Sequence, residues 1–172
     1  MKKKNFIISI DQGTTSSRAI LFDLKGKPIY SSQKEFTQYF PKSGWVEHNP
    51  EEIWSTTKTA LLNVLKRAKQ VKGNILTIGI TNQRETTVLW NKKTGKPIYN
   101  AIVWQDRRQE AYCEKLRKQN KETLIFNRTG LLIDSYFSAM KIKWILDNVP
   151  KAKILMNKKQ LLFGTIDSFL IW

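Results

Sequence analysis

The segment from Ile7 to Asp23 limits the possible folds of this chain more than any other part of the sequence. It reads Ile-Ile-Ser-Ile-Asp-Gln-Gly-Thr-Thr-Ser-Ser-Arg-Ala-Ile-Leu-Phe-Asp, so two apolar stretches flank a short polar loop rich in hydroxyl residues. Apolar runs bounded by Gly, Ser and Thr predict two strands joined by a sharp turn. Because Gly lets the backbone approach a ligand, and because backbone N–H groups attract anions, this turn is a candidate phosphate-binding loop.

The strand after this loop excludes the two commonest kinds of phosphate loop. A Walker-type loop needs G-x-x-x-x-G-K-[ST], a dinucleotide loop needs G-x-G-x-x-G, and both open a helix. This loop has neither pattern and leads straight into a second strand, as in the ATPases that are similar to actin, Hsp70 and the sugar kinases. Asp11, at the end of the first strand, is suited to hold a hydrated Mg²⁺ that carries phosphate oxygens. An ordinary hairpin with a polar turn is the alternative from this segment alone.

Length and composition indicate a globular protein. The 172 residues suit one domain, and the apolar content of 41% argues against disorder. No stretch approaches the roughly 18–20 consecutive apolar residues of a membrane span, and the apolar run after Lys2, Lys3 and Lys4 is interrupted at Asp11, too early for a signal peptide. Cys113 is the single cysteine and His48 the single histidine, so we expect no disulfide and no zinc site. These features predict a cytoplasmic protein without a membrane span.

The formal net charge of +16 raises the question of nucleic-acid binding. Of the 30 basic residues, 23 are Lys and seven are Arg, whereas base readout and bidentate phosphate contacts favour Arg. The sequence also has no RNP motif, no zinc finger and no basic helix of unbroken charge. We therefore interpret most of the charge as solvated surface and expect no nucleic-acid partner. A basic nucleic-acid module stays a separate hypothesis, whose complex with DNA would weaken steeply with added salt.

The order of the expected elements is that of a ribonuclease-H-like fold. Asn49 is a good helix N-cap, Pro50 suits the first helical position, and apolar residues recur at helical spacing as far as Ala68. The next run, 75–81, is nearly all apolar, which predicts a strand covered on both faces. Strands joined by turns precede the helix at Phe6–Ile10, Arg18–Asp23 and Pro28–Phe36. The sequence therefore predicts an α/β fold, a central mixed sheet with flanking helices.

The second half of the chain is expected to begin with a hairpin and then become helical. The hairpin strands are Thr86–Trp90 and Pro97–Val103. The helices are Arg107–Gln119 and Ser138–Asn148, the latter ended by Pro150. The last apolar run, 161–172, has no polar tail, so we expect the sequence to be a truncated one.

The residues after the buried strand are candidates for a binding site. Arg84 and Glu85 come soon after the strand 75–81, at the end where α/β folds bind ligands. A carboxylate accepts hydrogen bonds from hydroxyls and a guanidinium donates several, so this pair suits a polyol. Trp104 comes directly after the apolar run 101–103 and offers a flat surface to a carbon backbone. From position alone, a surface ion pair and a core tryptophan are the alternatives.

Four segments together resemble the FGGY family of carbohydrate kinases, and in particular its glycerol-phosphorylating members. They are Asp-Gln-Gly-Thr-Thr-Ser-Ser-Arg at 11–18, Gly-Ile-Thr-Asn-Gln-Arg-Glu-Thr-Thr at 79–87, Ala-Ile-Val-Trp-Gln-Asp-Arg-Arg at 101–108 and Ile-Asp-Ser-Tyr-Phe at 133–137. The resemblance continues to Asp167 and so covers almost the whole chain. It implies that residues 1–172 are the N-terminal domain of such a kinase, an actin-like ATPase domain that is incomplete here, with the C-terminal domain absent.

The resemblance also implies an activity and the residues that serve it. The activity is ATP-dependent phosphorylation of glycerol to sn-glycerol 3-phosphate, with ATP and Mg²⁺ as cofactors and a homo-oligomer as the full-length form. The implied glycerol contacts are Arg84, Glu85, Trp104 and Tyr136. The implied nucleotide-phosphate contacts are Gly13, Thr14, Thr15, Ser16 and Arg18, and Asp11 would hold Mg²⁺ through water.

The chain departs from the family pattern in ways that bear on function. Residues 139–141 read Ala-Met-Lys rather than the family's usual Gly-Thr-Lys. Ser135 stands where the family usually has Pro, and because loss of the Pro frees φ at one position, we expect a less rigid turn at Tyr136. The family's catalytic base is an aspartate in a Gly-Asp-Gln segment, which residues 1–172 lack. We therefore expect no catalytic base in this chain and no turnover by it alone. The alternatives are a non-catalytic fragment of a split or decayed gene, and a kinase for another polyol or a pentose.

Overall fold

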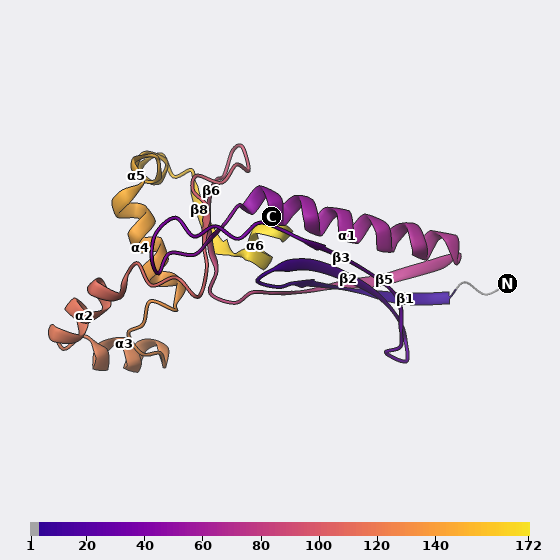
Figure 1. Cartoon of the computed structure of the whole chain (residues 1–172), viewed down its shortest axis with the longest axis horizontal. Coiled ribbons are helices and arrows are strands. Elements are labelled where there is room, and N and C mark those ends of the chain that lie inside the picture. Colours follow the sequence, from indigo (N-terminus) through magenta and orange to yellow (C-terminus); the bar gives the residue numbers. More distant parts are fainter. Residues whose placement is uncertain (1–3) are drawn as a thin grey trace. The chain divides into compact units, whose positions relative to one another are not determined.

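The structure of the chain, a computed structural model, describes residues 4–172. These residues divide into two compact units, and most of their elements are labelled in Figure 1. The first unit contains residues 4–38, 49–83 and 166–172, and the second contains residues 39–48 and 84–165. Of the basic residues considered above as part of a signal peptide, Lys2 and Lys3 lie outside the described residues.

The first unit, as far as the structure describes it, is built on a four-stranded mixed sheet. Its strands are β1 (Lys4–Gln12), β2 (Ser16–Asp23), β3 (Pro28–Glu35) and β5 (Gly73–Asn82), in the order β3-β2-β1-β5. The first three strands pair antiparallel, and β5 pairs parallel to β1 after a helical crossover. The predicted arrangement, three hairpin-linked strands and then a strand–helix–strand crossover, is therefore confirmed.

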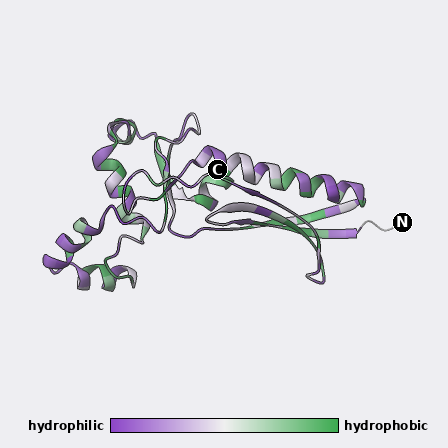
Figure 2. Cartoon of the chain, viewed as in Figure 1, coloured by the Kyte–Doolittle hydropathy of each residue, from purple (hydrophilic) through white to green (hydrophobic). Residues whose placement is uncertain are grey.

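Helix α1 (Pro50–Gln70) covers one face of this sheet, and it starts at Pro50 after the N-cap Asn49, as the sequence predicts. The side chain of Asn49 accepts a hydrogen bond from the Glu51 backbone N–H at 2.9 Å, so it caps the helix. Figure 2 shows hydrophobic and hydrophilic residues alternating around α1. At its other end Lys72 takes a left-handed conformation with φ of 52°, and Gly73 already belongs to β5. The buried residues of the helix are Pro50, Ile53, Thr56, Thr57, Ala60, Val64 and Ala68.

The core of the first unit reflects the two-residue period of its strands. Phe6, Ile8 and Ile10 alternate along β1 toward one face, and all three are buried. They pack with small and branched residues of β2 and α1, namely Ala19, Leu21, Ala60, Val64 and Ala68. Since full burial of one such large apolar side chain stabilises a fold by about 1.5–3 kcal/mol, this cluster supplies the main driving force for the unit.

The burial predicted for the strand at 75–81 is wrong. Strand β5 is present, but it lies at the edge of the sheet, with β1 as its neighbour in the described part of the chain. Leu76 is 52% exposed and Ile78 is 43% exposed. An apolar run shows that a strand can be buried, whereas actual burial depends on which elements pack against it, and that information is not local in the sequence.

The second unit contains a small antiparallel sheet and, among the residues described, four helices. The sheet consists of β4 (Glu47–His48), β7 (Ala101–Ile102), β6 (Thr87–Asn91) and β8 (Leu161–Thr165), in the order β4-β7-β6-β8. The predicted hairpin is confirmed in outline: Thr87 pairs with Ile102, Trp90 bridges Pro97, and the Asn91 side chain accepts hydrogen bonds from the turn after it. Strand β8 pairs with the other edge of β6 and was not predicted.

Two helices in the second half of the chain were predicted and three others were not. Helix α4 (Ser138–Asn148) has the predicted bounds. Helix α5 (Pro150–Asn157) starts at Pro150, the proline predicted to end α4. Helix α2 (Glu110–Lys118) begins later than the predicted Arg107, because Asp106 and Arg108 are drawn into a buried ion cluster. The elements not predicted are α3 (Glu122–Thr129), α5 and, in the first unit, α6 (Ile166–Ile171). Within residues 4–172 no helix has the length and apolar character needed to cross a membrane.

Candidate functional site

The candidate phosphate loop is the connection between β1 and β2, as predicted. Gly13 donates its backbone N–H to the Ser16 carbonyl at 2.9 Å, which closes a tight turn with Thr14 and Thr15 at its tip. A Cβ built on Gly13 would lie 3.4 Å from that carbonyl oxygen, so a glycine keeps the inner side of the turn open. Thr15 is exposed, and the Ser16 hydroxyl accepts a hydrogen bond from Gln33 at 2.9 Å, which leaves its proton able to be donated.

A pair of buried amides holds this loop. Gln12 is fully buried, and its side-chain N–H donates to the Gly13 carbonyl at 2.8 Å. Gln83, directly after β5, donates to Gln12 Oε1 at 3.1 Å and to the same Gly13 carbonyl at 3.2 Å. Buried amides that bond to one another and to the backbone restrict the loop to one conformation. Neither glutamine was identified as a site residue from the sequence.

The alternation of β2 divides the hydroxyl run between two roles. Ser17 is fully buried and points away from the loop, where its hydroxyl lies 3.0 Å from Thr56 Oγ1 and accepts a bond from Thr57 Oγ1 at 3.1 Å. These two threonines belong to α1, so the hydroxyl cluster joins the start of β2 to the helix. Since successive residues of a strand face opposite ways, Ser16 and Arg18 remain on the side of the loop.

Asp11 and Arg18 form an ion pair across the two strands, with Arg18 Nη2 2.6 Å from Asp11 Oδ2. The Asp11 side chain is 37% exposed, and its other oxygen makes no hydrogen bond within residues 4–172. Proteins commonly hold Mg²⁺ with one carboxylate, several waters and substrate phosphates. Asp11 fits that kind of site, and the described part of the chain contains no cluster of three or more potential metal ligands that would suit an all-protein cage.

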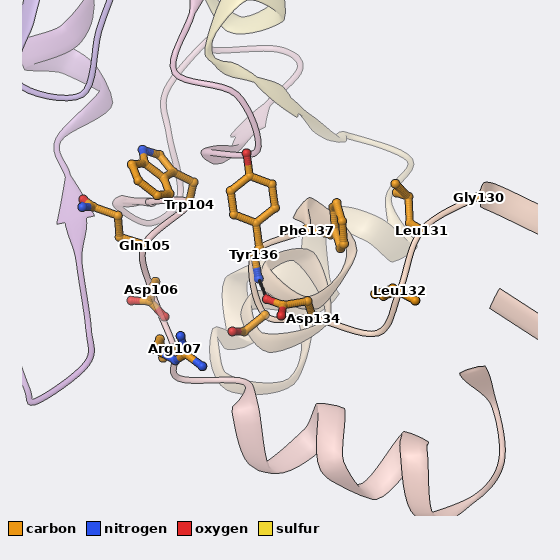
Figure 3. A pocket seen from close by; sticks show the side chains of 11 residues that line it. Trp104, Gln105, Asp106, Arg107, Gly130, Leu131, Leu132, Asp134, Tyr136 and Phe137 are labelled. Carbon is orange, nitrogen blue, oxygen red and sulfur yellow. Dashed lines mark hydrogen bonds between the residues drawn. The ribbon is translucent and has the colours of Figure 1, made fainter. Parts of the chain in front are cut away.

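The second unit contains a cavity of about 660 Å³, within the size range of small-molecule sites. Trp104 and Tyr136 line it, and Figure 3 shows their rings next to each other. The ring centroids lie 6.0 Å apart at an interplanar angle of 69°, an edge-to-face arrangement that aromatic pairs prefer. The tyrosine hydroxyl lies at the tip of the Tyr136 ring, away from the backbone (Figure 3), so this wall of two rings offers both apolar contact and one polar atom.

The turn that carries Tyr136 is fixed by several hydrogen bonds. The Tyr136 backbone N–H donates to Asp134 Oδ1 at 2.7 Å, the bond drawn as a dashed line in Figure 3. Ser135 is buried, and its hydroxyl donates to Glu110 Oε2 at 3.1 Å. Arg117 donates to the Ile133 carbonyl at 2.7 Å. Ser135 therefore ties the turn to α2 by its side chain.

Glu85 lies in the turn between β5 and β6, in a left-handed conformation with φ of 65°. A non-glycine residue held in this region is strained, and such strain is common at functional sites. Glu85 Oε2 accepts hydrogen bonds from the backbone N–H and from the hydroxyl of Ser138, both at 2.8 Å, at the N-terminus of α4. Because a helix N-terminus stabilises negative charge, this contact keeps the carboxylate in one position.

The structure brings most of the predicted polyol residues into one neighbourhood. Thr86, next to Glu85, accepts a hydrogen bond from the Trp104 backbone N–H at 3.3 Å, and Ser138 links Glu85 to the segment just after Tyr136. Arg84 is exposed in the same turn. Neither Arg84 nor Glu85 lines the cavity of Trp104 and Tyr136. The predicted phosphate residues belong to the first unit and the predicted polyol residues to the second.

A buried ion cluster supports the segment just after Trp104. Arg108 binds Asp106 through Nε and Nη2 at 2.9 and 2.8 Å, and Nη2 also binds Glu47 Oε1 at 2.8 Å. Its guanidinium lies 3.8 Å from the centre of the Trp45 ring and 4.5 Å from that of Trp144. Burial acts to lower the pKa of Arg108, but the hydrogen bonds to the two carboxylates raise that pKa above its ordinary value. The cation is therefore held permanently charged between two rings.

Comparison with known proteins gives the family of this architecture. The FGGY family of carbohydrate kinases, N-terminal domain, matches residues 6–172. The glycerol kinase of Alkaliphilus metalliredigens is 57% identical over 169 residues, which cover 98% of this chain and 34% of that protein. The crystal structure of Plasmodium falciparum glycerol kinase with ADP superposes with a TM-score of 0.93 at 36% identity, over 98% of this chain and 34% of that one.

A more distant neighbour shares the fold alone. Gluconate kinase from Lactobacillus acidophilus superposes with a TM-score of 0.84 at 21% identity, over 98% of this chain and 33% of that one. The chain thus spans about a third of the length of the curated relatives it matches. The expected fold, an actin-like α/β ATPase domain present in part, is confirmed by these neighbours. The chain belongs to the FGGY family of carbohydrate kinases, and what it matches is the family's N-terminal domain.

Proposed function

We propose that this chain supplies the glycerol-contact segments and the phosphate hairpin of a kinase that transfers a phosphoryl group from ATP to glycerol. The observation that carries the proposal is the paired wall of Trp104 and Tyr136, in the same unit as a carboxylate, Glu85, that is fixed at the N-terminus of α4 just after Tyr136. Identity of 57% to a glycerol kinase over 98% of the chain supports glycerol over other polyols.

The residues of the second unit would bind and orient the polyol. Trp104 presents an apolar face to the carbon backbone, while the hydroxyls need polar partners. Glu85 accepts hydrogen bonds from substrate hydroxyls, because Ser138 occupies Oε2 and leaves Oε1 available. Arg84 donates from its exposed guanidinium, and Tyr136 contributes its hydroxyl. Fixing a small flexible polyol in this way is the part of phosphoryl transfer that a binding domain supplies, since that reaction depends mainly on positioning and charge neutralisation.

The hairpin of the first unit would bind the phosphates of ATP. Thr14, Thr15 and Ser16 offer backbone N–H groups and hydroxyls around Gly13, and Arg18 supplies positive charge. Asp11 would hold Mg²⁺ through water, and the ion would neutralise phosphate charge when bound. The buried pair of Gln12 and Gln83 keeps the loop in place before ATP arrives, which lowers the entropy cost of binding.

We further propose that residues 1–172 alone do not turn over. The resemblance assigns the catalytic base to a Gly-Asp-Gln segment, and this sequence contains none. A positioned base contributes about 10²–10⁴-fold to a rate. In this proposal the chain acts as the N-terminal domain of a two-domain enzyme, which works in the reducing cytoplasm as a homo-oligomer.

The experiment joins this chain to the remaining two thirds of the Alkaliphilus metalliredigens glycerol kinase and measures glycerol-dependent ADP release in a coupled assay. The chimera is expected to be active, and the chain alone to be inactive. Glu85→Ala and Arg84→Ala should each lower kcat/KM at least about tenfold, because each removes a charged hydrogen-bond partner. Glu114→Ala, an exposed change on α2, is the matched control. An active chimera whose kinetics are unchanged by both site substitutions would disprove the assignment.

The same assay separates the alternative substrates and the alternative classes. A panel of pentoses and other polyols, with Mg²⁺-ATP held constant, identifies a kinase of different specificity by its kcat/KM ratio. A chimera that folds but shows no turnover with any of them would favour the non-catalytic fragment.

A further inference from the structure

Lys141 is the largest fully buried side chain in the described residues, with 1% of its surface exposed. Its position on α4 faces inward together with Ile145, one helical turn later. A buried lysine is expensive because an ammonium loses its hydration, so such a residue needs a compensating role. The polyol-binding role proposed above does not use it.

The ammonium of Lys141 contacts the turn that carries Tyr136. Lys141 Nζ donates to the Ser135 carbonyl at 3.0 Å and also donates to the Tyr136 carbonyl, so two successive carbonyls converge on one cation. The other bonds of this turn approach from elsewhere: Asp134 bonds the Tyr136 N–H, and Glu110 bonds the Ser135 hydroxyl. Lys141 is thus the contact through which α4 holds the backbone directly under the tyrosine.

Charged groups surround Lys141 from each element packed near it. Burial lowers its pKa to about 8, while the negative charges of Glu85, Asp106 and Asp134 act to raise it. The Cys113 thiol is itself buried and its pKa is raised, so it stays protonated near neutral pH. Lys141 is therefore mostly cationic at pH 7, and its hydrogen bonds to the two carbonyls are charge-assisted, roughly twice as strong as neutral ones.

We propose that Lys141 is a positioning residue, whose buried ammonium fixes the turn of Ser135 and Tyr136 and thereby the aromatic wall of the polyol pocket. The inference rests on the proposed function for its purpose, since the wall matters only if the pocket binds a polyol. Its structural content, that the order of the turn depends on the Lys141 cation, can be measured without any ligand.

The test compares the unmodified chain with Lys141→Met and Lys141→Arg by amide hydrogen exchange resolved by NMR. Met keeps the length but loses the charge, so the Tyr136 and Phe137 amides should exchange at least about tenfold faster. Arg keeps the charge and should restore most of the protection. The thermal midpoint of Lys141→Met should stay within about 5 °C of the unmodified chain, because removal of a buried charge offsets the lost hydrogen bonds. Lys143→Met, an exposed change on the same helix, is the control and should leave the turn unchanged.

A titration of the unmodified chain keeps the inference testable if Lys141→Met does not fold. Between about pH 7 and about pH 9.5 the buried ammonium converts to a neutral amine with weaker bonds, so the turn opens more easily while Lys141 itself stays buried. Protection of the Tyr136 amide against such local openings should fall after correction for intrinsic exchange, although global unfolding becomes less favourable over the same pH range. Lys141→Arg should show no such fall, because arginine stays charged. Equal protection at both ends of the titration, or in Lys141→Met, would overturn the role of Lys141.

A glycerol titration separates this inference from the proposed function. The signal of the Trp104 indole N–H should shift with glycerol in the unmodified chain and in Lys141→Arg, and less at the same concentration in Lys141→Met. If exchange depends on Lys141 as expected but glycerol shifts nothing in any variant, the turn is positioned by Lys141 and the polyol assignment fails. If glycerol binds equally in all variants, Lys141 does not position the wall.

Discussion

Removal of the Arg108 cation should destabilise the second unit more than any surface change nearby. The Arg108 side chain is 1% exposed, and its guanidinium binds two carboxylates whose side chains are 3% and 1% exposed. In Arg108→Met, Glu47 and Asp106 would stay buried with no cation beside them. Loss of one partner from a buried ion cluster costs about 3–5 kcal/mol, because the remaining charges lose their compensation. The stacking between Trp45 and Trp144 would also lose its cation, a further contribution of about 1 kcal/mol.

The assay is urea unfolding monitored by near-ultraviolet circular dichroism, because Trp45 and Trp144 flank the guanidinium directly. Arg107→Met is the matched control, because Arg107 is 67% exposed and pairs with Glu110 at 3.3 Å. An exposed pair of this kind contributes about 0–1 kcal/mol. The free energies of unfolding of the two variants should therefore differ by at least about 2 kcal/mol.

Lowering the pH tests whether uncompensated buried charge is the cause of the lost stability in Arg108→Met. In Arg108→Met the unpaired carboxylates favour protonation, so the folded variant gains protons that the unmodified protein does not. The difference in unfolding free energy between the two should become smaller as the pH falls from about 7 to about 5. A loss that is the same at both pH values would mean that a packing defect, rather than uncompensated charge, destabilises the variant. Equal losses for Arg107→Met and Arg108→Met would refute the reasoning altogether.

Three other outcomes depend on single contacts. Asn49→Ala removes the N-cap of α1 and should lower the free energy of unfolding by about 1 kcal/mol, measured by urea titration at 222 nm. Gly13→Val places a branched side chain near the Ser16 carbonyl, where the unbranched Cβ already lies at 3.4 Å, and should abolish binding of Mg²⁺-ATP while the far-ultraviolet spectrum is kept. Between pH 8 and 10.5 the unfolded chain holds the Lys141 proton that the folded chain has released, so this group makes unfolding free energy rise with pH. Lys141→Met should remove that rise, and a rise of the same size in the variant would contradict the assignment.

The parts of the fold that the sequence predicts are those set by neighbouring residues. The hairpin of β1 and β2, the N-cap of α1 and the bounds of α4 all depend on patterns within a few residues, and all three are confirmed. The exposure of β5 and the pairing of β8 with β6 depend on contacts between distant segments, and they were missed. The late start of α2 has the same origin, since Asp106 and Arg108 bond to Glu47 and to the backbone of Val46, some 60 residues away.

The residues missed at the candidate site share one physical feature that a sequence does display. Lys141 occupies the inward face of α4 with Ile145, and Gln83 is a buried residue directly after β5. A polar or charged residue at an inward position must bond to something, because a buried polar group without a partner costs several kcal/mol. The pattern thus predicts that such a residue bonds to another segment of the chain, although it does not identify that segment. Sequence motifs indicated the side chains expected to contact a ligand. The structure was needed to show that Gln83 bonds to the hairpin loop and that Lys141 bonds to the turn of Tyr136.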